Sequence, residues 1–176
     1  MKISYTYPIE NWIYIYRDEK SRYILGTKGE NPLIVFGINP STAKPNDLDP
    51  TLKSVERVSK NNGYDSWIMF NVYPQRATNP DNMHKNLNKE LHKNNLIHFE
   101  NILKKYNNSD IWAAWGSIIV KRDFLKKCLI DIIGISKKYN CNWLSAGPAT
   151  KNGHPKHPLY LKQDTKLIKY NIDFYK

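Results

Sequence analysis

The chain has no long apolar segment. None of its apolar runs approaches the roughly 20 residues that are needed to span a bilayer. Residues 1–5 also lack the apolar core of a signal peptide. We therefore expect a cytoplasmic protein with no membrane partner.

Cysteine is scarce, with two residues in a chain of 176. Cys128 lies in an apolar helical pattern and Cys141 opens an apolar run, so we expect two buried, reduced thiols. A metal site needs more ligands at close spacing than the sequence offers. The sequence therefore predicts no disulfide, no metal and no cofactor.

Acidic residues are few in the second half of the chain. Residues 85–176 carry seventeen Lys and Arg against seven Asp and Glu, whereas residues 1–84 carry ten against nine. A one-sided basic surface attracts polyanions, above all nucleic acid. A lysine-rich coding bias would produce the same charge and would also explain the abundant Asn, Ile and Tyr. The charge alone does not decide between these two explanations.

Apolar periodicity predicts an α/β fold. Residues 11–28 are rich in aromatic and β-branched side chains around a polar turn, which is typical of a hairpin. Continuous apolar runs predict buried strands at residues 33–38, 66–70, 111–115 and 141–146. Helical signals lie between these runs, from Asp49 to about Asn62, at 89–106 and at about 117–138. Residues 165–175 fit either a short strand or a short helix.

Alternating strands and helices predict parallel strands joined by right-handed crossovers. We therefore expect a single domain, a three-layer α/β/α sandwich with a central, mainly parallel four-stranded sheet. Residues 31–162 would form this core, residues 1–30 a hairpin extension and residues 163–176 a closing segment. The sequence leaves the oligomeric state open.

Each predicted strand ends in polar or glycine-bearing residues. Ligands of open α/β sheets bind at the carboxyl edge, so these ends predict one shared pocket. After the first strand and Gly37, Asn39 is placed to hold a water or a ligand amide, or simply to shape a turn. Backbone N–H groups of Ser41 and Thr42 are suited to an anion.

The second strand ends in Asn71, whose amide matches the edge of a pyrimidine or caps the strand. Arg76, a few residues further on, is either a phosphate ligand or a solvated loop charge. At the end of the third strand, Trp115 and Gly116 fit either core packing before a helix or a ligand contact.

A histidine-rich loop follows the fourth strand. His154 and His157 flank Lys156 in a segment that two prolines stiffen. A rigid loop that directs one imidazole into the pocket is the favoured interpretation. Surface histidines and a metal site are the alternatives, and the metal site is weaker because no further ligands lie nearby.

These strand ends resemble the uracil-DNA glycosylase superfamily. Residues 37–40, Gly-Ile-Asn-Pro, are similar to its first motif, and the strand that ends in Asn71 is similar to its second. Residues 115–117 look like its Trp-Gly segment, and either His154 or His157 matches its last motif. The resemblance implies that Asn39 positions water, Asn71 reads the base and one histidine stabilises the departing base. Tyr73 would stack on the base, since Ser41 stands where the superfamily has an aromatic residue.

The pattern also resembles a family of uncharacterised phage and bacterial proteins. The shared segments are Asn-Pro-Ser-Thr-Ala, Asp-Pro-Thr, Arg-Ala-Thr, Ala-Trp-Gly and Gly-His-Pro-x-His-Pro-Leu-Tyr, which fall at residues 39–43, 49–51, 76–78, 114–116 and 153–160. This resemblance covers about residues 22–162 and brings no assigned activity.

Three functions follow as hypotheses. The first is a glycosylase-like enzyme that flips a base out of DNA and hydrolyses its N-glycosidic bond. The second is a non-catalytic nucleotide binder, for instance in phage–host conflict. The third is a reader that binds an altered base without cutting it. All three predict nucleic acid or a nucleotide as the partner.

Overall fold

The computed structural model describes residues 8–176. The predicted absence of a signal peptide concerns residues 1–5, which lie outside the described residues. From residue 8 onward, no helix has both the length and the apolar character that crossing a membrane requires.

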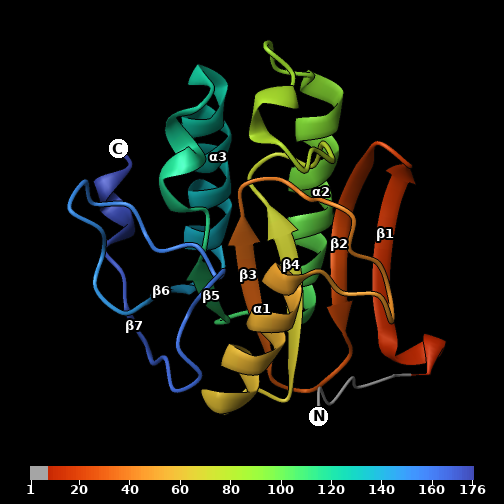
Figure 1. The fold of residues 1–176 in the computed structure, drawn as a ribbon, viewed down its shortest axis with the longest axis vertical. Helices are drawn as coiled ribbons and strands as arrows, with labels where there is room; N and C mark the ends of the chain where they lie inside the picture. Colours follow the sequence, from red (N-terminus) through yellow and green to blue (C-terminus); the bar gives the residue numbers. More distant parts are fainter. Residues whose placement is uncertain (1–7) are drawn as a thin grey trace.

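Residues 8–176 form one seven-stranded mixed sheet with the strand order β1-β2-β4-β3-β5-β6-β7 (Figure 1). The strands are β1 (Trp12–Asp18), β2 (Ser21–Thr27), β3 (Pro32–Gly37), β4 (Ser66–Asn71), β5 (Asp110–Ala113), β6 (Asn142–Ala146) and β7 (Leu167–Lys169). Strand β3 pairs in parallel with β4 and β5, and β5 with β6. The pairs β1–β2, β2–β4 and β6–β7 are antiparallel.

The sheet is larger than the predicted four mainly parallel strands. The hairpin is not an appendage, because β2 pairs with β4, and β7 from the closing segment pairs with β6. Gly26 permits the close approach of β2 and β4. A Cβ at Gly26 would collide with the carbonyl oxygen of Trp67 and would lie 2.8 Å from Cα of Ile68.

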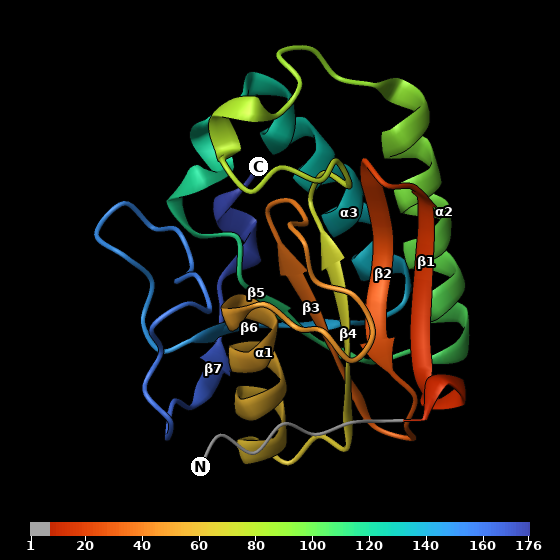
Figure 2. The same ribbon diagram turned by 45° about the vertical axis from the view of Figure 1, so that its right-hand side comes forward.

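The helices lie on both faces of the sheet (Figures 1 and 2). Helix α1 (Pro50–Asn61) packs on one face through Leu52, Val55 and Val58. Helices α2 (Lys89–Lys105) and α3 (Asp123–Lys138) pack on the other face. Two apolar clusters result, one on each side of the sheet. The protein therefore has three layers, which are helix α1, the sheet, and helices α2 and α3.

The third predicted helix, at about 117–138, begins later than expected. Residues 116–120 form a 3₁₀ turn, and Arg122 has extended backbone angles that separate this turn from α3. The first two helices begin where the sequence indicates, because Asp49 caps α1 and Asn88 caps α2 through side-chain oxygens. The closing segment contains both β7 and a 3₁₀ turn at Ile172–Phe174.

Two glycine substitutions test the tight contact between β2 and β4. Gly26→Ala should lower the free energy of unfolding by about 1–3 kcal/mol, because rigid backbone atoms must move to admit the methyl group. Gly134→Ala, in the middle of α3 with nothing within 4 Å of its Cβ, should instead raise it by about 0.5–1 kcal/mol. Urea unfolding measures both. An unchanged free energy of unfolding in Gly26→Ala would contradict this account of the strand contact.

Candidate functional site

A β-bulge in the hairpin places Arg22 opposite Tyr16. Ile15 pairs with Ile24, but the next residue, Tyr16, pairs with Arg22, so Tyr23 is the extra residue. Bulges redirect side chains in this way. Tyr23 and Ile24 consequently belong to the cluster under α2 and α3, whereas Arg22 shares the face of Tyr16.

The loop that follows β4 continues the sheet beside β2. The N–H of Arg22 donates to the carbonyl of Pro74 at 3.0 Å, and the N–H of Arg76 donates to the carbonyl of Lys20 at 2.8 Å. Arg76 thereby lies next to Arg22, although 54 residues separate them in the chain.

Asn39 holds the loops after β3 and β4 together. Its Nδ2 donates to the carbonyls of Ala77 at 2.7 Å, Pro40 at 3.2 Å and Gln75 at 3.4 Å. Beside this clamp, the N–H of Ala77 donates to the carbonyl of Pro40 at 2.9 Å. The amide nitrogen is thus committed to backbone oxygens, and these bonds leave Oδ1 as the free acceptor of the side chain.

A cleft of about 540 Å³ opens between these loops and the end of β1. In Figures 1 and 2, the orange loop after β3 crosses β4 and β2 toward β1. The cleft combines aromatic rings, hydroxyl groups and charges of both signs, contributed by Tyr14, Tyr16, Asp18, Glu19, Ser41, Thr42, Lys44, Arg76, Ala77 and Thr78. Four of the site residues expected from the strand ends or near them lie at this edge, namely Asn39 in the clamp and Ser41, Thr42 and Arg76 in the lining.

Tyr14 and Tyr16 form an aromatic wall. Their ring centroids lie 4.8 Å apart at an interplanar angle of 31°. Arg76 fixes Tyr14 by donating from Nη2 to its hydroxyl at 2.8 Å, and donates from Nη1 to the carbonyl of Ser41 at 2.8 Å. Tyr16 lines the cleft and remains 54% exposed, so it is accessible to a ligand.

Asn71 lies at the end of β4, next to Gly37. Its side chain is 1% exposed, and its Nδ2 has no hydrogen-bond partner within residues 8–176. A Cβ at Gly37 would lie 2.8 Å from Oδ1 of Asn71, so glycine is needed there. The backbone carbonyl of Asn71 accepts from Nδ2 of Asn95 on α2 at 2.8 Å. Asn71 does not line the 540 Å³ cleft.

Tyr73 and Trp115 belong to the core rather than to the cleft. Both are 0% exposed. The Tyr73 hydroxyl bonds to Nδ1 of His84 at 2.6 Å, and Nε1 of Trp115 donates to the Tyr175 hydroxyl at 2.9 Å. A ring enclosed in this way offers no face to a base, so stacking by Tyr73 finds no support in the structure.

His157 contacts the end of the third predicted strand. A Cβ at Gly116, whose φ is +64°, would lie 3.3 Å from Cβ of His157. Nδ1 of His157 accepts from the N–H of Leu159 at 3.1 Å, which leaves Nε2 to carry the proton of the neutral ring. Burial lowers the pKa of His157, and the charge of Asp49 partly opposes this shift.

His154 lines a second cavity, separate from the 540 Å³ cleft. Its Nδ1 bonds to the Tyr175 hydroxyl at 2.8 Å, and burial lowers its pKa. It borders a cavity of about 340 Å³ together with residues from the 3₁₀ turn, α3 and the C-terminal segment, namely Ile119, Val120, Arg122, Asp123, Lys126, Phe174 and Tyr175. Lys156, between the two histidines, is exposed. The histidine-rich loop therefore does not bring both imidazoles to one site.

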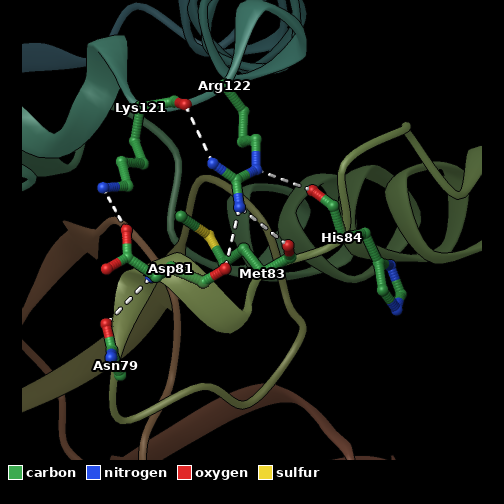
Figure 3. A network of polar contacts seen from close by, with 6 residues as sticks. All are labelled: Asn79, Asp81, Met83, His84, Lys121 and Arg122. Carbon is green, nitrogen blue, oxygen red and sulfur yellow. Dashed lines mark hydrogen bonds and ion pairs between the residues drawn. The ribbon is translucent and has the colours of Figure 1, made fainter.

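Arg122 holds the loop after β4 against the start of α3 (Figure 3). Its guanidinium donates to the carbonyls of Asp81 at 2.9 Å, Met83 at 3.1 Å and His84 at 3.1 Å. An ion pair between Lys121 and Asp81 adds to this network. The network fixes the segment that carries His84, the partner of the buried Tyr73 hydroxyl.

The described residues contain no group of three or more His, Cys, Asp or Glu arranged to hold a metal ion. Cys128 and Cys141 are free, and burial raises their pKa values to about 12 and about 11. Both thiols are therefore mainly protonated near neutral pH, which disfavours a role as a nucleophile or a metal ligand.

Sequence reasoning missed Arg22 and seven residues of the cleft lining, namely Tyr14, Tyr16, Asp18, Glu19, Lys44, Ala77 and Thr78. The tyrosines were assigned only as strand formers. Their alternation after Trp12 is the signal that points to one face of β1. Arg22 carries no such signal, because its face depends on the bulge.

Fold and site together define a mixed α/β protein with an aromatic, polar cleft at the carboxyl edge of its sheet. The chain belongs to the family described as protein of unknown function (DUF1643), whose model matches residues 22–159. This match includes Arg22, Asn39, Arg76 and His157 but not β1. Comparisons with curated proteins and with solved structures gave no match.

The lowered pKa of His157 predicts a loss of stability in acid. Because the folded state disfavours the protonated ring, the free energy of unfolding should fall as pH drops below about 6.5, the ordinary value for histidine. His157→Asn retains an acceptor for the N–H of Leu159 but does not titrate. Urea unfolding between about pH 7 and pH 5 should therefore show a shallower decline in the variant, and equal slopes would contradict the assignment.

Proposed function

We propose that this protein binds a nucleotide or single-stranded nucleic acid in the 540 Å³ cleft. The observation that carries the proposal is the exposed ring of Tyr16 beside Arg76 and Lys44. Proteins that bind single strands combine aromatic platforms with basic side chains in this way.

The shape and chemistry of the cleft support this ligand class. Its volume falls in the range of small-molecule sites. Tyr16 offers a stacking surface for a base, and the Ser41 and Thr78 hydroxyls, 2.9 Å apart, offer hydrogen bonds to a sugar or a phosphate. The formal net charge of +11 adds a general attraction for polyanions.

The arrangement of the central strands supports a likeness to the uracil-DNA glycosylase superfamily as part of the proposal. The pairings of β3 with β4 and β5, and of β5 with β6, are parallel. If the likeness holds, strands β3 to β6 correspond to the core of the superfamily. The hairpin of β1 and β2 then adds the aromatic wall of Tyr14 and Tyr16.

Tyr16→Ala should weaken binding of a fluorescent ten-nucleotide single strand. Loss of one stacked base corresponds to about 1–3 kcal/mol, or roughly a 5- to 150-fold rise in the dissociation constant. Fluorescence anisotropy at fixed salt measures this change. Tyr160→Ala is the matched control, because Tyr160 is 93% exposed and lies in the histidine-rich loop. Equal affinities of the Tyr16→Ala and Tyr160→Ala variants would contradict the proposal.

A second candidate function is hydrolysis of an N-glycosidic bond, and the clamped amide of Asn39 favours it. Since Nδ2 is bound to backbone carbonyls, Oδ1 is held in a fixed orientation as a hydrogen-bond acceptor. An acceptor of this kind is suited to orient an attacking water. By the superfamily resemblance, Asn71 would contact the base and His157 would stabilise the departing anion, so the base would have to enter beyond the 540 Å³ cleft, whose lining contains neither residue.

This candidate predicts abasic products. Oligonucleotides that carry uracil, hydroxymethyluracil, hypoxanthine or mismatched thymine are incubated with the protein and treated with alkali. Asn39→Ala should slow strand cleavage by about 100-fold or more. Asn61→Ala is the matched control and should cleave nearly normally, because the Asn61 amide also donates to a backbone carbonyl, that of Gln163 at 2.6 Å, but lines neither cavity. Wild-type rates in Asn39→Ala, or no product from any substrate, would refute hydrolysis and leave binding.

A further inference from the structure

Two arginine side chains converge on one neutral oxygen beneath the cleft. Nη1 of Arg22 donates to the carbonyl of Ala43 at 2.9 Å, and Nη1 of Arg76 lies 3.5 Å from the same oxygen. Arg22 is 1% exposed, and this is its one side-chain hydrogen bond within residues 8–176. The Nε atoms of both arginines are buried there without a partner.

This pair leaves positive charge uncompensated. Burial and the charge of Arg76 lower the pKa of Arg22 to about 10, while Asp49 opposes the shift. Asp49 forms no ion pair with Arg22, and its Oδ1 already accepts from the N–H of Leu52. Buried charges are normally paired, because an unpaired charge is costly to desolvate. An anion above Arg76 would supply the missing negative charge.

The charges around the cleft indicate where an anion would lie. Asp18 and Glu19, on the hairpin turn, repel an anion from that end. Lys44 and Arg76 lie on the loops after β3 and β4, which also carry the hydroxyls of Ser41 and Thr78. An anion is therefore favoured beside Arg76 and Lys44, where these hydroxyls add hydrogen-bond donors.

We propose that Arg76 binds a phosphate group of the ligand, and that Arg22, behind it, strengthens this binding through its charge. The inference rests on the proposed function in assigning that phosphate to a nucleotide or a nucleic acid. Arg76 is the contacting residue, whereas Arg22 is a positioning residue that also holds the Ala43 carbonyl. The shared chemistry is a phosphate, either the terminal group of a nucleotide or the diester of a strand.

Inorganic phosphate is the first probe. Isothermal titration at constant ionic strength measures its binding to the wild type and to Arg76→Lys, Arg22→Met and Arg57→Lys. Arg57 is the matched control, since it also donates to a backbone carbonyl, that of Leu161 at 3.1 Å, yet lines neither cavity. We expect about tenfold or greater weakening in the Arg76 and Arg22 variants and no change in Arg57→Lys.

A structural role for the arginines predicts a different result. If they only hold the loop at Ala43, the variants lose stability but keep the phosphate affinity of the wild type, which would overturn the inference. Absence of phosphate binding by the wild type would overturn it as well. Should Arg22→Met not fold, Arg76→Lys alone decides, because it keeps the positive charge.

A second set of ligands separates this inference from the proposed function. A nucleoside that binds as tightly as its monophosphate would refute the phosphate site and retain nucleotide binding. Phosphate binding by Arg76 with no added affinity for nucleotides would retain the phosphate site and refute the proposed function. Oligonucleotides with and without a 5′-phosphate distinguish the two sources, since a preference for the phosphorylated end supports a terminal group and equal affinity supports a diester.

Discussion

The cleft depends on the side-chain amide of Asn39. By donating to the carbonyls of Ala77, Pro40 and Gln75, it joins two loops that leave neighbouring parallel strands. Further bonds join the same loops, from the N–H of Ala77 to the carbonyl of Pro40 and from the Arg76 guanidinium to the carbonyl of Ser41. A short amide is suited to this task, because its two N–H groups bond to backbone carbonyls of both loops while its oxygen stays available.

The clamp at Asn39 and the bulge in β2 together bring Arg76 and Arg22 next to each other. The bulge turns Arg22 toward Tyr16, and the clamp sets Arg76 beside it. Like charges are brought together where burial makes their repulsion stronger than in water. Such an arrangement opposes stability locally and is typical of a binding site rather than of a core. In our account, an anionic ligand offsets the repulsion between Arg22 and Arg76.

Much of the fold was predictable from residues whose effects are local. The apolar runs that form β3 to β6 and the cap at Asp49 were visible in the sequence. Long-range contacts were not visible. Pairing of β2 with β4 requires the backbone approach at Gly26, and the face of Arg22 follows from one extra residue in a ladder. Tyr73 and either His154 or His157 were predicted to face one pocket, but their partners, His84, Leu159 and Tyr175, come from segments whose positions only the tertiary structure fixes.

The most direct test of the central claim is to locate the bound nucleotide. Nuclear magnetic resonance of the labelled protein, titrated with a nucleoside monophosphate, reports amide groups and the arginine Nε–H groups together. We predict that the signals that shift come from residues 14–19, 41–44 and 76–78 and from the side chains of Arg22 and Arg76. Shifts confined to the cavity beside His154, or no saturable shift at all, would contradict the account.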